Sequence, residues 1–166
     1  MPDNILGPSG YLKMHQTNLE ILVLITDGAC DHNMEAMKGS YDVTKFHKVR
    51  EFSWIGPKSE DDYQTIRQCL TANAEQLEAF RLNIIDWSKA DDFWFLDFTR
   101  FSNNKTRRTN FFAEDILGVP LDAEKGEYGL TFPALRSLYL GQLSFKSATI
   151  SLASAFSFSR LKELRL

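Results

Sequence analysis

Cys30, Asp31 and His32 are consecutive in the chain, and each has a side chain that can bind zinc. A structural zinc site needs four ligands, and they usually include a Cys-x-x-Cys or His-x-x-x-His pair. Neither spacing occurs here, and Cys69 and His47 would join the three residues only if folding happened to bring them together. We therefore expect a loop at this position and no metal site.

A catalytic cysteine would need a neighbouring histidine and an acid that orients that histidine. Cys69 lies on the apolar side of a predicted helix, where a buried and inert thiol is usual. The G-x-S-x-G nucleophile motif, the Gly-rich phosphate loop and the H-E-x-x-H zinc motif do not occur. The sequence thus predicts no catalytic residue and no cofactor, and an enzyme of unknown class ranks lowest among the functions we consider.

Lys105, Arg107 and Arg108 form a basic cluster that is flanked by Asn103 and Asn104. A cluster of this kind can be a nuclear-import signal or a contact for nucleic acid. The chain as a whole is acidic, however, with a net charge of −3. We prefer a solvated loop tip for the cluster, and we expect no nucleic-acid partner.

Composition also bears on membrane association and compartment. No apolar stretch approaches the roughly 20 residues that span a bilayer, and the first residues lack the basic and apolar segments of a secretory signal. The two cysteines make no disulfide framework, as is usual in reducing surroundings. We therefore expect an intracellular protein, cytoplasmic or nuclear, with no membrane contact.

Five six-residue segments supply the elements that would position these side chains. Residues 135–140 and 161–166 both fit L-x-x-L-x-L, the strand signature of a leucine-rich repeat, and so do residues 19–24. Residues 77–82 fit with one Phe for Leu, and residues 49–54 fit with looser apolar residues. The first positions are spaced by 30, 28, 58 and 26 residues, so the array either misses a degenerate unit or carries an insertion. A repeat strand cannot bury its apolar side alone, so the matches predict strands stacked side by side.

Helical patterns separate the strand segments. Tyr63, Ile66 and Leu70 recur at helical spacing, which predicts a helix over residues 60–74. Two further helices are expected, over residues 8–15 and 146–156. Helix, loop and strand in repeated order give parallel strands through right-handed crossovers. The strands expected on this basis cover residues 19–25, 49–54, 77–84, 135–140 and 161–166.

Residues 86–131 do not fit the repeat. Their many aromatic rings favour packing, so we expect an insertion with short helices over residues 92–101 and 110–117. The predicted fold class is α/β: an irregular leucine-rich-repeat solenoid, with parallel strands on its concave side and helices on the other. Residues 1–166 would form this single domain.

Alternation along the strands predicts the surface that the repeats present. Positions 1, 4 and 6 of each segment would point inward and the intervening positions outward. Position 5 then forms a row containing Arg81, Tyr139 and Arg165, and position 2 adds Arg136 and Lys162. Tyr and Arg are favoured anchors of protein interfaces, so we predict that these five residues bind a protein. The alternative is a solvated strand face whose residues only stabilise one another.

Position 2 also predicts ion pairs between neighbouring strands. Glu20, Arg50 and Glu78 are successive at this position and alternate in sign. Each cross-strand pair would contribute about 0.2–1 kcal/mol.

Four stretches carry a resemblance to a known family: residues 85–87 (Ile-Asp-Trp), residues 105–118, residues 132–140 (Phe-Pro-Ala-Leu-Arg-Ser-Leu-Tyr-Leu) and residues 158–166. With residues 49–57, they resemble the leucine-rich-repeat-like regions of filamentous-fungal F-box proteins. In that family an N-terminal F-box recruits a cullin-type ubiquitin ligase, and the repeats capture a substrate. No F-box is seen in this chain, so the resemblance implies only the substrate-capturing part.

The expected function is a non-catalytic protein–protein interaction module, a candidate for the substrate-binding part of an F-box ubiquitin-ligase receptor. We expect a protein partner, and a cullin-ligase adaptor only if an F-box exists outside this chain. The alternative is a partial gene product or structural fragment without independent activity. Leu166 closes the sequence in mid-repeat, so we expect the domain to be incomplete at this end.

Overall fold

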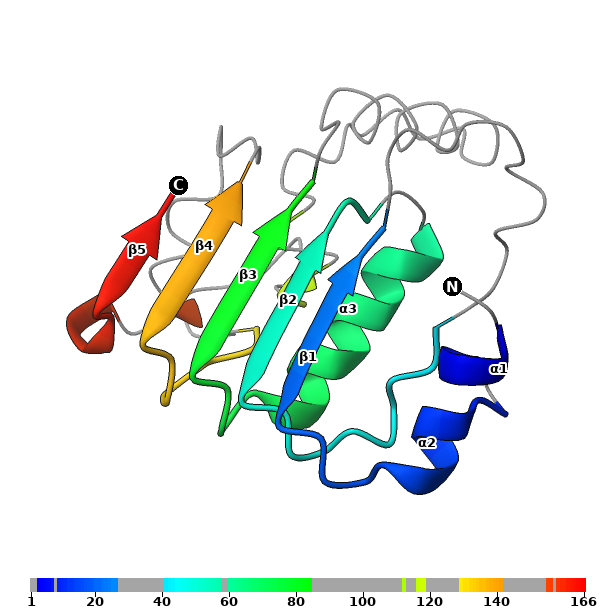
Figure 1. The fold of residues 1–166 in the computed structure, drawn as a ribbon. Helices are drawn as coiled ribbons and strands as arrows, with labels where there is room; N and C mark the ends of the chain where they lie inside the picture. The colour runs from blue at the N-terminus through cyan, green and yellow to red at the C-terminus, as the bar shows by residue number, and fades with distance from the viewer. Residues whose placement is uncertain are drawn as a thin grey trace, which may run out of the picture.

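A five-stranded parallel sheet forms the centre of the protein. The computed structural model describes residues 3–7, 9–26, 41–57, 60–84, 112, 116–118, 129–141, 155–156 and 158–166. Neighbouring strands in the sheet are parallel and follow one another in chain order (Figure 1). The strands are β1 (Ile21–Ile25), β2 (Glu51–Ile55), β3 (Ala79–Asn83), β4 (Ser137–Gly141) and β5 (Glu163–Arg165). The predicted α/β class and the predicted parallel sheet are confirmed.

The five strands pair in one register. Phe52 is opposite Leu22 and Phe80, and Leu138 is opposite Phe80 and Leu164, so the fourth positions of the segments form one row. A slip of one residue would turn every apolar side chain to the other face, and the apolar pattern therefore sets the register. Because β3 pairs directly with β4, no strand lies between them in the sheet, although 58 residues separate Leu77 from Leu135.

The turn before a strand makes the same backbone hydrogen bonds at four successive places. The carbonyl oxygen of Glu20 accepts hydrogen bonds from the backbone N–H groups of Arg50 and Glu51, at 2.7 and 3.0 Å. The second-position carbonyls of Arg50, Glu78 and Arg136 accept the same pair of bonds from the following strand, at 2.7–3.1 Å. The chain therefore enters β2, β3, β4 and β5 in the same way.

The predicted strand segments begin too early. Each strand starts at the third position of its segment, because the first two positions belong to the preceding turn. Val49, Leu77 and Leu135 occupy the first position and are fully buried. Their side chains close the core at the end of the sheet where the strands begin.

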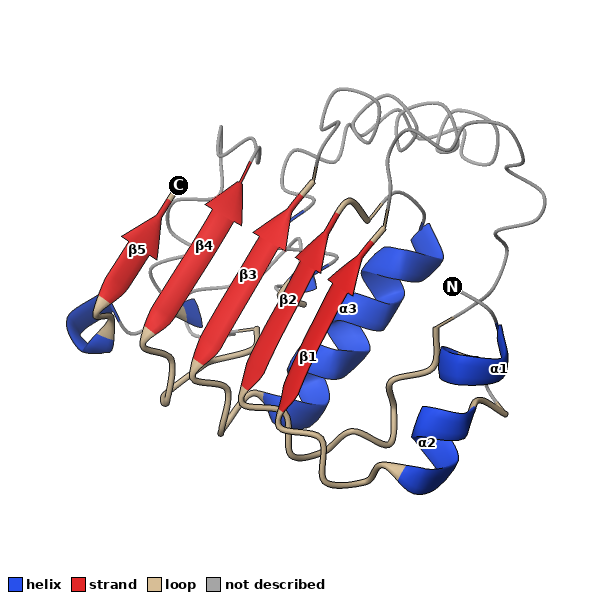
Figure 2. Ribbon diagram, viewed as in Figure 1, coloured by secondary structure: helices blue, strands red, loops and turns tan. Residues whose placement is uncertain are grey.

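Helix α3 (Glu60–Asn73) covers one face of the sheet and confirms the helix predicted over residues 60–74 (Figure 2). Its side chains Tyr63, Ile66 and Leu70 are buried, as their helical spacing requires. On the sheet side, the rings of Phe52 and Phe80 are stacked with their centroids 6.0 Å apart. The core therefore lies between this helix and the alternate, inward side chains of the strands.

Asn73, the last residue of α3, is buried and joins the helix to the turn before β2. Its Nδ2 donates hydrogen bonds to the carbonyl oxygens of Phe46 and Cys69, at 2.8 and 2.9 Å. Its Oδ1 accepts from the backbone N–H of Val49 at 2.9 Å and from Nε2 of Gln76 at 2.8 Å. Both polar atoms of this amide are hydrogen-bonded, as burial requires.

Two short helices, α1 (Asp3–Leu6) and α2 (Tyr11–His15), lie beyond the β1 edge of the sheet (Figure 1). The helix predicted over residues 8–15 begins only at Tyr11, because the chain turns back against α1 at Gly10. A Cβ atom at Gly10 would lie 2.4 Å from the carbonyl oxygen of Ile5. The helices predicted over residues 92–101, 110–117 and 146–156 lie largely outside the described residues.

Strand β5 departs from the predicted inward orientation. The fourth and sixth positions of β1–β4 are buried as predicted, but Leu164 is 47% exposed and Leu166 is 73% exposed. The prediction is wrong for this segment because β5 is an edge strand, and no described α-helix packs behind it (Figure 2). The short helix η2 (Phe158–Arg160) precedes it and has no buried residue.

Candidate protein-binding face

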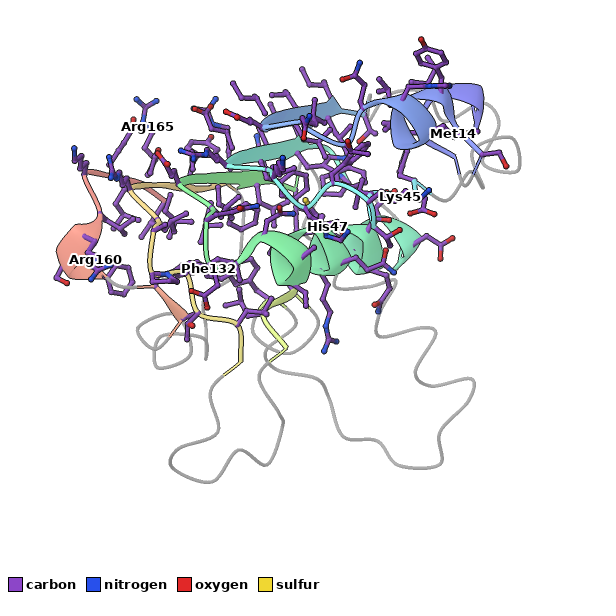
Figure 3. The ribbon with its side chains drawn as sticks, turned by 90° about the horizontal axis from the view of Figure 1, so that it is seen from below. Met14, Lys45, His47, Phe132, Arg160 and Arg165 are labelled. Atoms are coloured by element: carbon purple, nitrogen blue, oxygen red, sulfur yellow. The ribbon has the colours of Figure 1, made fainter. Side chains whose placement is uncertain are left out.

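The outward side chains of the strands form a surface that we call the open face. It consists of the third and fifth positions of the segments and, for the first four segments, the residue that follows the segment, on the side of the sheet opposite α3. Figure 3 looks along the strands from their starting ends, with α3 below the sheet and the open-face side chains above it. No described α-helix covers β2–β5 on this side.

Three of the predicted binding residues are brought together on β3, β4 and β5. Arg81 pairs in register with Tyr139, and Tyr139 pairs with Arg165, so the three are direct cross-strand neighbours. The guanidinium carbon of Arg81 lies 5.6 Å from the centroid of the Tyr139 ring. A cation–π contact at an exposed site contributes about 0.5–1 kcal/mol. The predicted Arg-Tyr-Arg row therefore exists as a contiguous surface.

Glu163 lies beside this row, opposite Ser137 in the register of β4 and β5, and was missed at the sequence level. Nη2 of Arg165 lies 2.6 Å from Oε1 of Glu163, and Oγ of Ser137 donates a hydrogen bond of 3.0 Å to Oε2. The hydrogen bond from Ser137 and the charge of Arg165 hold the pKa of this carboxyl below its usual range, and the charge of Arg81 adds to the effect. The available signal was the i, i+2 spacing of Glu163 and Arg165, which puts both side chains on one face of a strand.

The other two predicted binding residues lie beside the row. Arg136 and Lys162 are exposed second-position residues in the turns before β4 and β5. Three residues separate this position from the fifth, a rise of about 10 Å along an extended strand. They therefore form a basic edge next to the row.

Of the two ion pairs predicted at the second position, the one between Arg50 and Glu78 is present, whereas Glu20 and Arg50 form none within the described residues. Nη1 of Arg50 lies 3.0 Å from Oε1 of Glu78, with both side chains exposed. Exposed pairs contribute little, typically below about 1 kcal/mol.

The opposite end of the open face is apolar. Ile21, Val23 and Ile25 of β1 are 55%, 53% and 69% exposed. All five residues of β1 are apolar, a composition typical of parallel strands that are buried on both faces. Neighbouring exposed apolar side chains on one strand face are a feature that interaction sites share. The open face thus changes from apolar at β1 to basic and aromatic at β3–β5.

The predicted burial of Cys69 is confirmed. The side chain is buried, and burial raises the pKa of the thiol to about 12, with a smaller opposing effect from the hydrogen bond to Asn73. The thiol therefore stays protonated at neutral pH and is a poor nucleophile. Trp54 is buried as predicted, and its Nε1 donates a hydrogen bond of 3.2 Å to Oγ1 of Thr26.

Other candidate residues of the sequence lie outside the described residues: Cys30, Asp31, His32 and the basic cluster over residues 105–108. Within the described part of the chain, no three His, Cys, Asp or Glu side chains are grouped so that they could hold a metal ion. The helices in this part are all too short or too polar to cross a membrane.

The fold and this face together define an α/β protein whose parallel sheet is covered by a helix on one side and presents polar, aromatic and apolar side chains on the other. Comparisons of the chain with family models, with curated proteins and with solved structures found no match.

Proposed function

We propose that this chain is a non-catalytic protein–protein interaction module and that it binds its partner through the open face. The observation that carries the proposal is the cross-strand row of Arg81, Tyr139 and Arg165, in which both arginines are exposed and Tyr139 is half-buried. Arg and Tyr are enriched among the residues that dominate binding energy at protein interfaces. The apolar side chains of β1 extend the same surface and would add area that a partner can bury.

We further propose that the architecture is an irregular leucine-rich-repeat solenoid with this face on its concave side. Two observations support it: the five segments are in one register, and the same paired hydrogen bonds occur before β2, β3, β4 and β5. Solenoid proteins stack repeats that contact only their neighbours, and they present extended binding surfaces.

The proposed place in a ubiquitin ligase rests on the resemblance to fungal F-box proteins. In this proposal the chain is the substrate-binding part of a receptor, and a cullin-ligase adaptor is a partner only if an F-box exists outside residues 1–166. The protein would then work inside the cell, in the cytoplasm or the nucleus. The competing proposal is a structural fragment without independent activity.

Affinity capture with matched variants tests the proposal. The wild-type chain, an Arg81→Ala/Tyr139→Ala double variant and a Lys45→Ala control would be immobilised and exposed to lysate of the source cells. Lys45 is exposed and lies at the other end of the molecule from Arg165 (Figure 3). We expect the wild type and the control to capture the same proteins and the double variant to lose them.

Two results would decide against the interaction module. They are capture of the same proteins by all three forms, and capture of nothing above a blank resin. Melting temperatures of the three forms would verify that each is folded. A cullin-ligase adaptor among the proteins lost from the double variant would indicate that the open face, rather than an F-box, contacts the ligase, and this would overturn the proposed place in the receptor.

A further inference from the structure

The two ends of the open face differ in chemistry. At β1 the three outward side chains are aliphatic and more than half exposed. At β4 and β5 the outward side chains and those of the preceding turns are Arg136, Ser137, Tyr139, Lys162, Glu163 and Arg165. Three of these six are basic and one is acidic, although the whole chain has a net charge of −3.

The spacing of the strands sets the length of a ligand that could contact both ends. Neighbouring strands lie about 4.8 Å apart, so β1 and β4 are separated by about 14 Å and β1 and β5 by about 19 Å. An extended segment covers these distances in about four to six residues. A short stretch of chain lying across the strands therefore reaches from the apolar end to the basic end.

From this arrangement we infer the chemistry of the partner: an extended acidic segment with an apolar end, which crosses the sheet with its apolar side chains over β1 and its carboxylates over β4 and β5. The inference rests on the proposed function, because it describes what the open face binds. Charge complementarity is the argument for the acidic end, and the exposed aliphatic side chains are the argument for the apolar end.

The surface already binds one carboxylate in this way. Glu163 accepts a hydrogen bond from Ser137 and lies 2.6 Å from Nη2 of Arg165. The hydrogen bond from Ser137 and the charges of Arg165 and Arg81 favour a negative charge at this place and lower the pKa of the carboxyl. A carboxylate of the partner would compete with Glu163 for Arg165. Removing the carboxylate of Glu163 should therefore strengthen binding of an acidic ligand.

Selection from a random 12-residue peptide display library on the immobilised chain tests the inference. We expect the enriched peptides to contain a cluster of Asp or Glu and, about four to six residues away, two or more Leu, Ile, Val, Phe or Met. One enriched peptide would then be labelled, and its dissociation constant measured by fluorescence polarisation at several salt concentrations.

Single substitutions separate the two ends in this assay. Arg165→Ala should weaken binding about two- to fivefold and reduce its salt dependence, because an exposed ion pair is lost. Val23→Ser should weaken binding while leaving the salt dependence unchanged. Glu163→Gln should strengthen binding about twofold or more, and Lys45→Ala should change nothing.

The outcomes distinguish this inference from the proposed function. If the enriched peptides require Arg81 and Tyr139 for binding but are basic or uncharged, the inference of an acidic partner is wrong. The proposed interaction module would still be supported by such peptides. Weaker binding to Glu163→Gln than to wild type also overturns it. If no enriched peptide depends on the open face for binding, the inference is wrong. The capture experiment tests the proposed function independently of this result.

Discussion

Asn73 is the residue whose removal gives the sharpest test of how this fold is held together. It is buried at the end of α3, and its amide satisfies the carbonyl oxygen of Phe46 and the backbone N–H of Val49 in the turn before β2. Asn73→Ala removes this amide and leaves both backbone groups without a partner. The small alanine side chain also leaves a space in the core.

The expected cost follows from those two groups. An unsatisfied buried donor or acceptor costs about 1–3 kcal/mol, so two of them should lower the free energy of unfolding by about 2–6 kcal/mol. For a chain of 166 residues the entropy of unfolding is about 0.35 kcal/mol/K, which converts this loss to a fall in Tm of about 6–17 °C.

Urea unfolding and differential scanning calorimetry would measure the change. Asn18→Ala is the matched control, because Asn18 is exposed and its Oδ1 accepts one surface hydrogen bond of 2.7 Å from Lys48. The control should shift Tm by less than about 2 °C. If Asn73→Ala and Asn18→Ala melt within 2 °C of each other, the buried amide does not stabilise the turn as argued.

Asn73→Asp adds a check on the direction of the hydrogen bonds. A buried carboxyl beside the carbonyl oxygen of Phe46 should have a raised pKa, because burial and the loss of the Nδ2 donor disfavour the charged form. The Asn73→Asp variant should then be most stable below about pH 3.9, the pKa of Asp in the unfolded chain. Its free energy of unfolding should fall as pH rises through the higher pKa of the folded state. A pH-independent difference from wild type would contradict this reasoning.

Three further predictions concern single side chains. In an NMR titration the carboxyl of Glu163 should have a pKa below the usual value of about 4.3, and Ser137→Ala should raise it; an unchanged value in the variant would contradict the hydrogen bond as its main cause. Cys69 should resist thiol reagents in the native protein and react once the protein is unfolded in urea, whereas rapid native labelling would show that it is not buried. Phe52→Ala should cost about 3–5 kcal/mol in urea unfolding, because the ring is buried and stacked on Phe80; a loss below about 1 kcal/mol would mean that the pair contributes little.

The register of the sheet could be predicted from the sequence because apolar residues at the fourth and sixth positions have only one arrangement that buries them together. The same is true of α3, where Tyr63, Ile66 and Leu70 have an unambiguous helical spacing. The start of each strand could not be predicted, because a buried first-position residue such as Leu77 fits a turn as well as a strand.

The candidate site was predictable in part for a similar reason. Alternation identified Arg81, Tyr139 and Arg165 as outward neighbours, since register follows from the buried positions. The exposed apolar end at β1 could not be predicted from the sequence, because a run of five apolar residues does not reveal whether one face of the strand or both are covered. The contact between Glu163 and Ser137 depends on side-chain direction across two strands, which sequence spacing alone does not give.

The paired N–H donors of each turn fix where a strand starts, whatever path the chain takes to reach it. The backbone N–H of Arg50 donates to the carbonyl oxygen of Glu20, 30 residues earlier in the chain. The backbone N–H of Arg136 donates to the carbonyl oxygen of Glu78, which is 58 residues earlier. Closing a flexible loop costs only about 0.6 kcal/mol more for each doubling of its length. Lengthening the chain between β3 and β4 should therefore cost little free energy, because the same two hydrogen bonds still define the start of β4.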